Sequence, residues 1–215
     1  PRNILRTTMD RGWDFVKRAT TIVLLSSIVL WFLKTYGYVD GAIVAVEDSN
    51  VSLIASIGKL FAWIFYPLGW AGDMAWKATV ATATGLIAKE EVVMTFGTLY
   101  NSGGEISETG QEIWKLIQAD FGPVRAYSFM IFNLLCAPCF AAIGAIKREM
   151  GSRKWTFITI VYMCAIAYAA ALIVFQIFGL ITGEALFGPY TIVALAVLAA
   201  LLYLIFRKGY KSAND

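Results

Sequence analysis

The sequence contains no histidine, and this absence excludes several kinds of site at once. Haem held between two histidines and the usual zinc sites built on histidine are both excluded. The sequence also lacks a phosphate-binding loop of the form G-x-x-x-x-G-K-[ST] and the G-x-S-x-G turn of a serine hydrolase. We therefore do not expect an enzyme, and a nucleotide bound in this way cannot supply energy to the chain.

Charged residues are scarce, at 15% of the 215 residues, whereas 59% are hydrophobic. This composition is typical of a membrane protein. Only helices and closed barrels satisfy their backbone groups in hydrocarbon, and the long apolar runs lack the alternation of a barrel strand. We predict an all-α integral membrane protein, a polytopic helical bundle of about four to six spans in which re-entrant half-helices are one option. The net charge of +3 reflects topology and does not indicate nucleic-acid binding.

Three regions are expected along the chain. Residues 1–18 are basic and partly amphipathic, which predicts a helix on the cytoplasmic face of the membrane. Residues 19–207 form the transmembrane region, which begins with a span over 19–36 and an acidic outer loop. Residues 208–215 form a cytoplasmic tail.

The middle of the chain allows two topologies. Residues 53–68 are short for a span and form either a tilted span or a re-entrant half-helix. A longer segment follows over 76–100, and a further span covers 123–146. Lys147, Arg148, Arg153 and Lys154 then cluster in one loop, which the positive-inside rule assigns to the cytoplasm. With final spans over 155–178 and 189–206, both termini are cytoplasmic whether four or six segments cross.

The first candidate site is Cys136-Ala137-Pro138-Cys139, in the middle of the 123–146 span. Pro138 has no backbone N–H, so we expect the helix to kink there and to free a carbonyl near Leu134 inside the membrane. Two sulfurs beside that carbonyl could bind a borderline transition metal, because Cys136 and Cys139 lie three residues apart on one helical face. The alternative is that the cysteines are small apolar fillers beside a tolerated kink.

The second candidate is Lys89-Glu90-Glu91, near the middle of the 76–100 segment. Ionised side chains at membrane depth cost several kcal/mol, so they usually face a cavity, a partner charge or a passing ion. The alternative is that Lys89 neutralises Glu90 or Glu91 at the end of a half-helix.

Other polar and aromatic side chains have simpler explanations. Asn133, Tyr162, Tyr168 and Gln176 are expected to form hydrogen bonds between helices. Six tryptophans near predicted span ends are expected to anchor the chain at the membrane interface, namely Trp13, Trp31, Trp63, Trp70, Trp76 and Trp155.

Residues 134–155, LLCAPCFAAIGAIKREMGSRKW, resemble the second gate motif of the ferrous iron transport protein B family, with its Leu-Leu-x-x-Pro-Cys core and following basic stretch. GLIAKEEVVMTFGTLY, residues 85–100, looks like the Ala-Lys-Glu region of the same family. RNILRTTMDRGWDFVKRATTIVL, residues 2–24, is similar to the segment before its later spans. By this resemblance Cys139 is the gate cysteine, Pro138 its proline and Glu90 the intramembrane glutamate. Cys136 and Ala142 depart from the commonest form of the motif.

The resemblance implies the carboxy-terminal gate portion of a permease that moves Fe²⁺ across the bacterial inner membrane into the cytoplasm. Cys139, Cys136, Glu90 and Glu91 are then the expected transient metal ligands, with no permanently bound cofactor. GTP would act only through a GTP-binding domain, which with the first gate region would lie on a missing part or another chain; a homo-oligomer is left open. The rival hypotheses are a gate-type transporter of an organic solute such as a nucleoside, and a structural membrane subunit that transports nothing.

Overall fold

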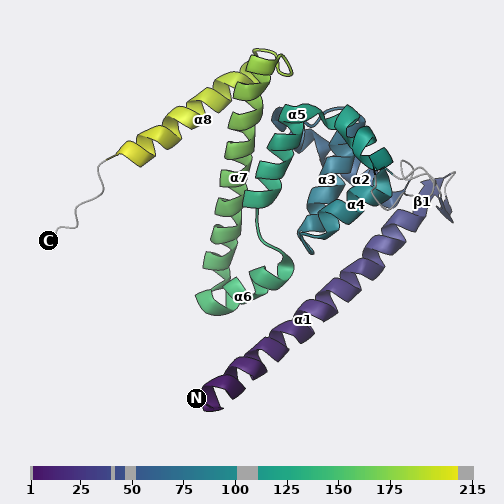
Figure 1. Ribbon diagram of the computed structural model, residues 1–215, viewed down its shortest axis with the longest axis vertical. Helices are drawn as coiled ribbons and strands as arrows, with labels where there is room; N and C mark the ends of the chain where they lie inside the picture. The colour runs from purple at the N-terminus through teal and green to yellow at the C-terminus, as the bar shows by residue number, and fades with distance from the viewer. Residues whose placement is uncertain (1, 40–41, 47–51, 101–110, 208–215) are drawn as a thin grey trace.

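The computed structural model describes residues 2–39, 42–46, 52–100 and 111–207, and almost all of these residues are helical (Figure 1). The elements in chain order are α1 (Arg2–Thr35), β1 (Tyr36–Val39), β2 (Ala42–Ala45), α2 (Leu53–Ala62), the 3₁₀-helix η2 (Trp63–Leu68), α3 (Asp73–Gly85), α4 (Glu91–Leu99), α5 (Gln111–Leu135), α6 (Phe140–Met150), α7 (Arg153–Thr182) and α8 (Pro189–Phe206). The predicted all-α fold class is thus confirmed.

Two of the described helices, α7 and α8, are long and apolar enough to cross a membrane. The pair formed by Leu53–Leu68 and Asp73–Gly85 would be a third span if it counted as one, but it bends by 102° at the intervening turn. The bend leaves both expected forms open, a broken span or a re-entrant loop. The number of full crossings therefore stays a prediction.

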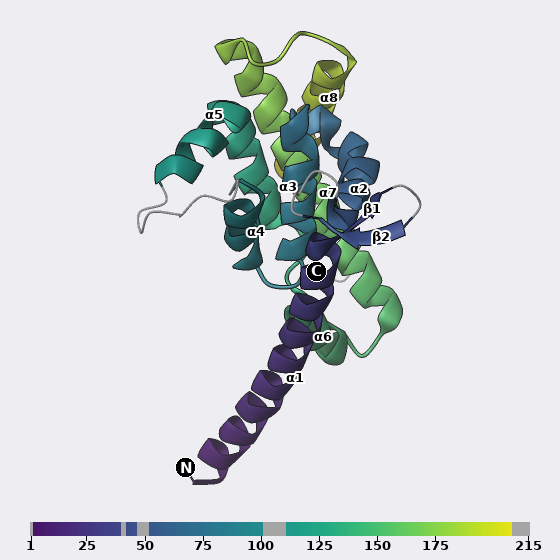
Figure 2. The same ribbon diagram turned by 90° about the vertical axis from the view of Figure 1, so that its right-hand side faces the viewer.

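Helix α1 runs without a break from Arg2 to Thr35, so the expected surface helix and first span are one continuous element. Figures 1 and 2 show its N-terminal half projecting beyond the rest of the bundle, at the end of the molecule where α6 turns into α7. The basic cluster predicted to be cytoplasmic lies at that turn. The predicted tail, 208–215, lies outside the described residues.

An antiparallel hairpin was not predicted. Strands β1 and β2 pair with Tyr36 opposite Ala45 and Val39 opposite Ala42. The sequence signal is an Asp-Gly pair between two runs of β-branched and aromatic residues, a common hairpin pattern. The hairpin follows the last turn of α1 directly, so the predicted span over 19–36 ends one residue earlier than expected.

The core is aromatic and lies where η2, α3, α5 and α7 meet. Trp70 is fully buried and stacks on Phe65, with ring centroids 4.5 Å apart, and it also contacts Phe129 and Phe132. Trp76 is also buried. The prediction that Trp70 and Trp76 are interfacial anchors is wrong, because the turn after Pro67 folds both residues back into the bundle. The other four tryptophans of that set are exposed.

Buried hydrogen bonds join the helices around this core. The Ser128 hydroxyl lies 3.2 Å from the carbonyl oxygens of both Leu68 and Ala171. The Tyr168 hydroxyl donates to the Ile64 carbonyl at 2.8 Å, and the Gln176 amide donates to the Pro67 carbonyl at 2.9 Å. The prediction of interhelical hydrogen bonds is thus confirmed for Tyr168 and Gln176. It is wrong for the Asn133 amide nitrogen, which donates to Phe129 within its own helix.

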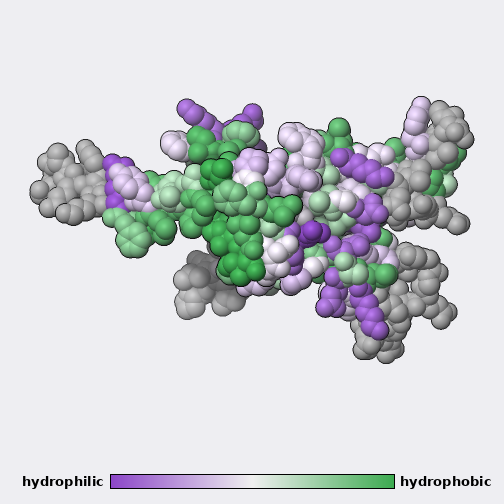
Figure 3. Space-filling view, turned by 90° about the horizontal axis from the view of Figure 1, so that it is seen from above, coloured by the Kyte–Doolittle hydropathy of each residue, from purple (hydrophilic) through white to green (hydrophobic). Residues whose placement is uncertain are grey.

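Apolar side chains also cover much of the outer surface, especially on α7 and α8. Only 17% and 11% of the apolar windows of these two helices are buried within the chain. Seen from above in Figure 3, hydrophobic residues spread over the side of α7 and α8, whereas hydrophilic residues gather toward the opposite side. Together with the apolar helices, this surface is that of a membrane protein.

Candidate functional site

The predicted 76–100 segment is not a single helix. Helix α3 ends at Gly85 and α4 begins at Glu91, and residues 86–90 between them form turns, which we name the first break. The hydroxyls of Thr84 and Thr95 lie 2.9 Å apart and are both buried, so they tie the end of α3 to α4 across this turn. The Lys89-Glu90-Glu91 motif therefore lies at a helix interruption.

The predicted 123–146 span is interrupted as well. Helix α5 ends at Leu135, α6 begins at Phe140, and residues 136–139 are non-helical, which we name the second break. The expected kink at Pro138 is thus a complete break. Proline provides the physical reason, because it lacks the N–H that would continue the helix and its ring clashes with the preceding turn.

The two breaks face each other. The backbone N–H of Phe140, the first residue of α6, donates to the Leu86 carbonyl at 2.9 Å. A helix leaves its first N–H groups and its last carbonyls without partners inside the helix. Here the free donor at the start of α6 meets the free acceptor just after α3, which holds two interrupted helices together.

Lys89 forms the second link between the breaks. Its ammonium group donates to the backbone carbonyl of Asn133, in the last turn of α5, and lies 3.3 Å from the Cys136 sulfur. The side-chain oxygen of Asn133 is buried and has no hydrogen-bond partner among the described residues. The Lys89 ammonium group thus contacts a backbone carbonyl oxygen and a thiol sulfur. Asn133 carries a second oxygen, on its side chain, that has no partner among the described residues.

The predicted ligands differ in their surroundings. Cys136 is buried, whereas Cys139 is half-buried and forms the N-cap of α6. Glu90 is exposed at the start of α4, and half-buried Glu91 is close enough to Lys34 of α1 for their charges to interact. Within the described part of the chain, no three cysteine or carboxylate side chains form a group that could hold a metal ion. The four-residue ligand set stays a prediction.

The alternative reading of the charged motif finds no support. Lys77 pairs with Asp120 and Arg148 with Glu149, whereas no ion pair among the described residues joins Lys89 to Glu90 or Glu91. Its ammonium group turns to α5 instead.

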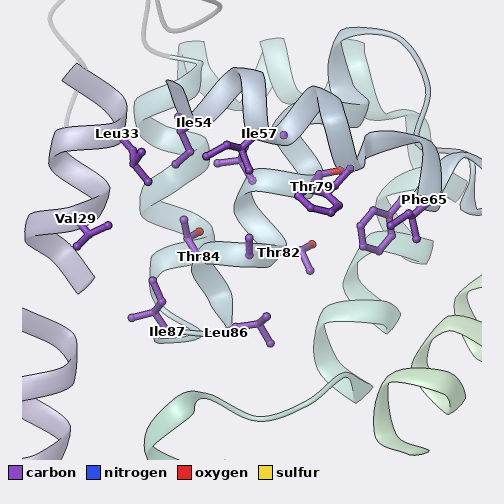
Figure 4. A pocket seen from close by; sticks show the side chains of 15 residues that line it. Val29, Leu33, Ile54, Ile57, Phe65, Thr79, Thr82, Thr84, Leu86 and Ile87 are labelled. Atoms are coloured by element: carbon purple, nitrogen blue, oxygen red, sulfur yellow. The ribbon is translucent and has the colours of Figure 1, made fainter. Parts of the chain in front are cut away.

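One cavity borders the first break through Leu86 and Ile87, and the lining of another contains no residue of either break. The first, of about 470 Å³, lies between α1, α2 and α3 and is lined by apolar groups such as Val29, Leu33 and Ile57 (Figure 4). Such walls do not suit a hydrated cation. The other, of about 330 Å³, lies between η2, α5 and α7 and is lined by both Arg125 and Glu184, whose opposite charges offer no net attraction for a cation.

The sequence model of the family described as "Gate: Nucleoside recognition" matches residues 16–153, which include both breaks. This chain belongs to the gate family. The match covers the gate motif that the sequence resemblance predicted and extends beyond half of the chain.

Relatives of this gate chain are named as iron transporters. It is 36% identical, over 80% of its length, to an Fe(2+) transporter FeoB of Methanocaldococcus jannaschii, and 34% identical over 82% to one of Staphylococcus aureus. It is also 27% identical over 82% of its length to an Fe(2+) transport protein A/Fe(2+) transporter FeoB fusion protein of Porphyromonas gingivalis. The chain spans about a quarter of the length of these relatives, 24% to 25%. The predicted resemblance is confirmed; no solved structure matches the chain.

Sequence reasoning missed two members of this site. Asn133 was expected only to form a hydrogen bond between helices, although it precedes Cys136 by three residues and so shares its helical face. No sequence feature could have indicated the Leu86 carbonyl, because every residue carries a carbonyl group. Only the fold determines which carbonyl faces the end of another helix.

Proposed function

We propose that this chain is the membrane gate portion of a ferrous iron permease, and that Fe²⁺ passes between the two breaks on its way into the cytoplasm. The observation that carries the proposal is the Lys89 ammonium group, a cation held by the Asn133 carbonyl and the Cys136 sulfur between two interrupted helices. Unwound backbone and the carboxyl ends of half-helices are the features that coordinate cations inside membranes. The iron-transporter names of the relatives supply the identity of the ion.

The ligand chemistry suits Fe²⁺. Sulfur favours borderline and soft metals over Mg²⁺ or Ca²⁺, and oxygen ligands keep the binding weak enough for the ion to leave. In this proposal Glu90, exposed at the start of α4, attracts the cation. Cys139 and Cys136 then replace part of its water shell, Cys136 being the more deeply buried sulfur. Glu91 balances the charge of the passing ion.

The proposal extends to the whole protein. The chain itself carries no catalytic activity, and energy enters through a GTP-binding domain outside it. Both termini face the cytoplasm of the bacterial inner membrane, and the first gate region lies on another part of the protein or another chain.

Anaerobic uptake of labelled Fe²⁺ into cells tests this function, with the full-length protein compared with its Cys139→Ser variant. We expect uptake to fall about tenfold or more, because metal-site substitutions typically cost that much in affinity or activity. Cys164→Ser is the matched control, since Cys164 lies in the continuous helix α7. Normal uptake by Cys139→Ser at equal membrane levels would remove this cysteine from the ion path.

A second candidate, transport of a nucleoside, is favoured by the description of the family as nucleoside recognition. The same cells measure it directly. Uptake of a labelled nucleoside that depends on this protein, together with iron uptake that does not, would replace the iron proposal.

A further inference from the structure

The place that Lys89 fills has the properties of a cation site. The last turn of α5 contains no basic residue of its own, and the carboxyl end of a helix carries negative partial charge. Lys89 reaches this end from a different segment, 44 residues earlier in the chain than Asn133. Its ammonium group therefore supplies a positive charge that α5 does not supply itself.

The groups around the ammonium are those that would bind a metal ion. They are the Asn133 backbone oxygen and the Cys136 sulfur, with the unpaired side-chain oxygen of Asn133 on the same residue. Lysine carries three N–H donors on one compact charge, so it can satisfy several acceptors at once, much as a small cation does.

Lys77, by contrast, has an acidic partner. Lys77 is paired with Asp120 at 3.3 Å and lies over the Tyr100 ring. Lys89 is held instead by neutral groups, although two glutamates follow it directly in the sequence. Because neutral groups hold the Lys89 ammonium group, another cation could take its place at the same ligands.

We propose that Lys89 is a tethered substitute for the transported cation: it fills the Asn133 and Cys136 ligand positions when no ion is present, and an arriving divalent ion displaces it. This inference rests on the proposed function and deepens it. Two positive charges cannot share these ligands without repulsion, so binding of the ion requires Lys89 to leave. The return of Lys89 then helps the ion to leave, at a cost in affinity.

Co²⁺ binding to the purified full-length protein tests the displacement without transport. Co²⁺ is a borderline ion that accepts sulfur ligands, and its bond to a thiolate gives an absorption band that can be titrated anaerobically in detergent. We compare the parent with Lys89→Gln, which removes the charge, and Lys89→Arg, which keeps it. Lys115→Gln, at an exposed position in the first half of α5, is the control for loss of a positive charge elsewhere.

We expect Lys89→Gln to bind Co²⁺ about tenfold more tightly, because a site occupied by Lys89 for about 90% of the time is free for only the remainder. Lys89→Arg and Lys115→Gln should bind as the parent does. An unchanged dissociation constant in Lys89→Gln overturns the proposal, and so does the absence of a sulfur band in every variant. Tighter Co²⁺ binding in a protein that fails to transport iron would retain this inference while the proposed function falls.

Uptake kinetics separate this role from a merely structural one. Loss of the substitute cation predicts a lower KM together with a lower maximal rate, because the ion binds more tightly and leaves more slowly. A lysine that only caps α5 predicts a lower maximal rate with KM unchanged, and this result would overturn the proposal. The Lys89→Arg variant should restore both constants toward the parent.

Discussion

Gly69 is the residue on which the return of the chain into the core depends. It ends η2 in the left-handed conformation, with φ of +85°, and its N–H donates to the Tyr66 carbonyl at 3.0 Å. A Cβ built on Gly69 would lie 2.2 Å from the ring of Phe175, itself buried. Only glycine both adopts this φ without strain and leaves room for the ring.

Gly69→Ala should therefore destabilise the protein more than the same change at Gly183, where φ is +79° and a Cβ would meet nothing within 4 Å. The left-handed conformation alone costs about 1–2 kcal/mol for a residue with a side chain. The clash with Phe175 should add about 1–3 kcal/mol. Unfolding of both variants in mild detergent measures the difference, and equal stabilities would show that Phe175 moves aside freely.

The structural role of a single residue was predicted well only where it follows from the residue type alone. Pro138 marks the second break because it lacks the N–H that would continue the helix. Lys89 was noted as a charged residue within an apolar segment, but the helix interruption at this motif was not predicted. The burial of Trp70 and Trp76 was not predicted, since an aromatic residue near a span end has the same pattern whether it faces lipid or the core. The role of Asn133 depends on which segment approaches it, and sequence spacing does not report that.

At the scale of elements, hydropathy predicts where apolar segments lie but not whether they are continuous. Residues 76–100 and 123–146 each read as one segment, yet each consists of two helical pieces. Hydropathy is averaged over a window of many residues, whereas a few residues are enough to interrupt a helix. The average therefore does not reveal the interruption. The final two helices were predicted well because they contain no internal proline or charged motif.

Backbone groups freed at the breaks must be satisfied by protein or by water, because hydrocarbon offers no partners. We therefore expect water to reach the second break. In variants that keep one cysteine each, a small charged thiol reagent should modify Cys139 at least about tenfold faster than Cys164, which lies within α7, because only a hydrated thiol forms the reactive thiolate readily. Equal rates measured by mass spectrometry would contradict a hydrated break.

At the scale of the whole molecule, the first and last helices, α1 and α8, extend away from the bundle (Figure 1). Figure 1 shows α8 extending away from the other helices, and within the described residues its packing is chiefly against α7. Leu186, just before α8, is 91% exposed, and Phe206 at its end is 81% exposed. Lipid or another part of the protein must cover this apolar surface in the membrane.

The positive-inside rule gives this arrangement a testable orientation. In a background without the natural cysteines, Leu186→Cys should react with an impermeant thiol reagent added outside intact cells, whereas Met9→Cys and Arg207→Cys should react only after the membrane is opened. All three positions are exposed, so access depends on the side of the membrane. Labelling of Met9→Cys from outside would invert the predicted topology, in which the basic turn between α6 and α7 is cytoplasmic.

The hydrogen bond from Phe140 to Leu86 has a consequence for genetics. Because both its atoms belong to the backbone, a scan that replaces each side chain by alanine leaves the bond in place, and such a scan would not detect what this bond contributes. Proline is the one residue that removes the donor, and the first position of a helix is where proline fits best. Phe140→Pro thus removes this link between the breaks without shortening α6, while the link through Lys89 remains. The substitution that tests the backbone bond is therefore one that alanine scanning never makes.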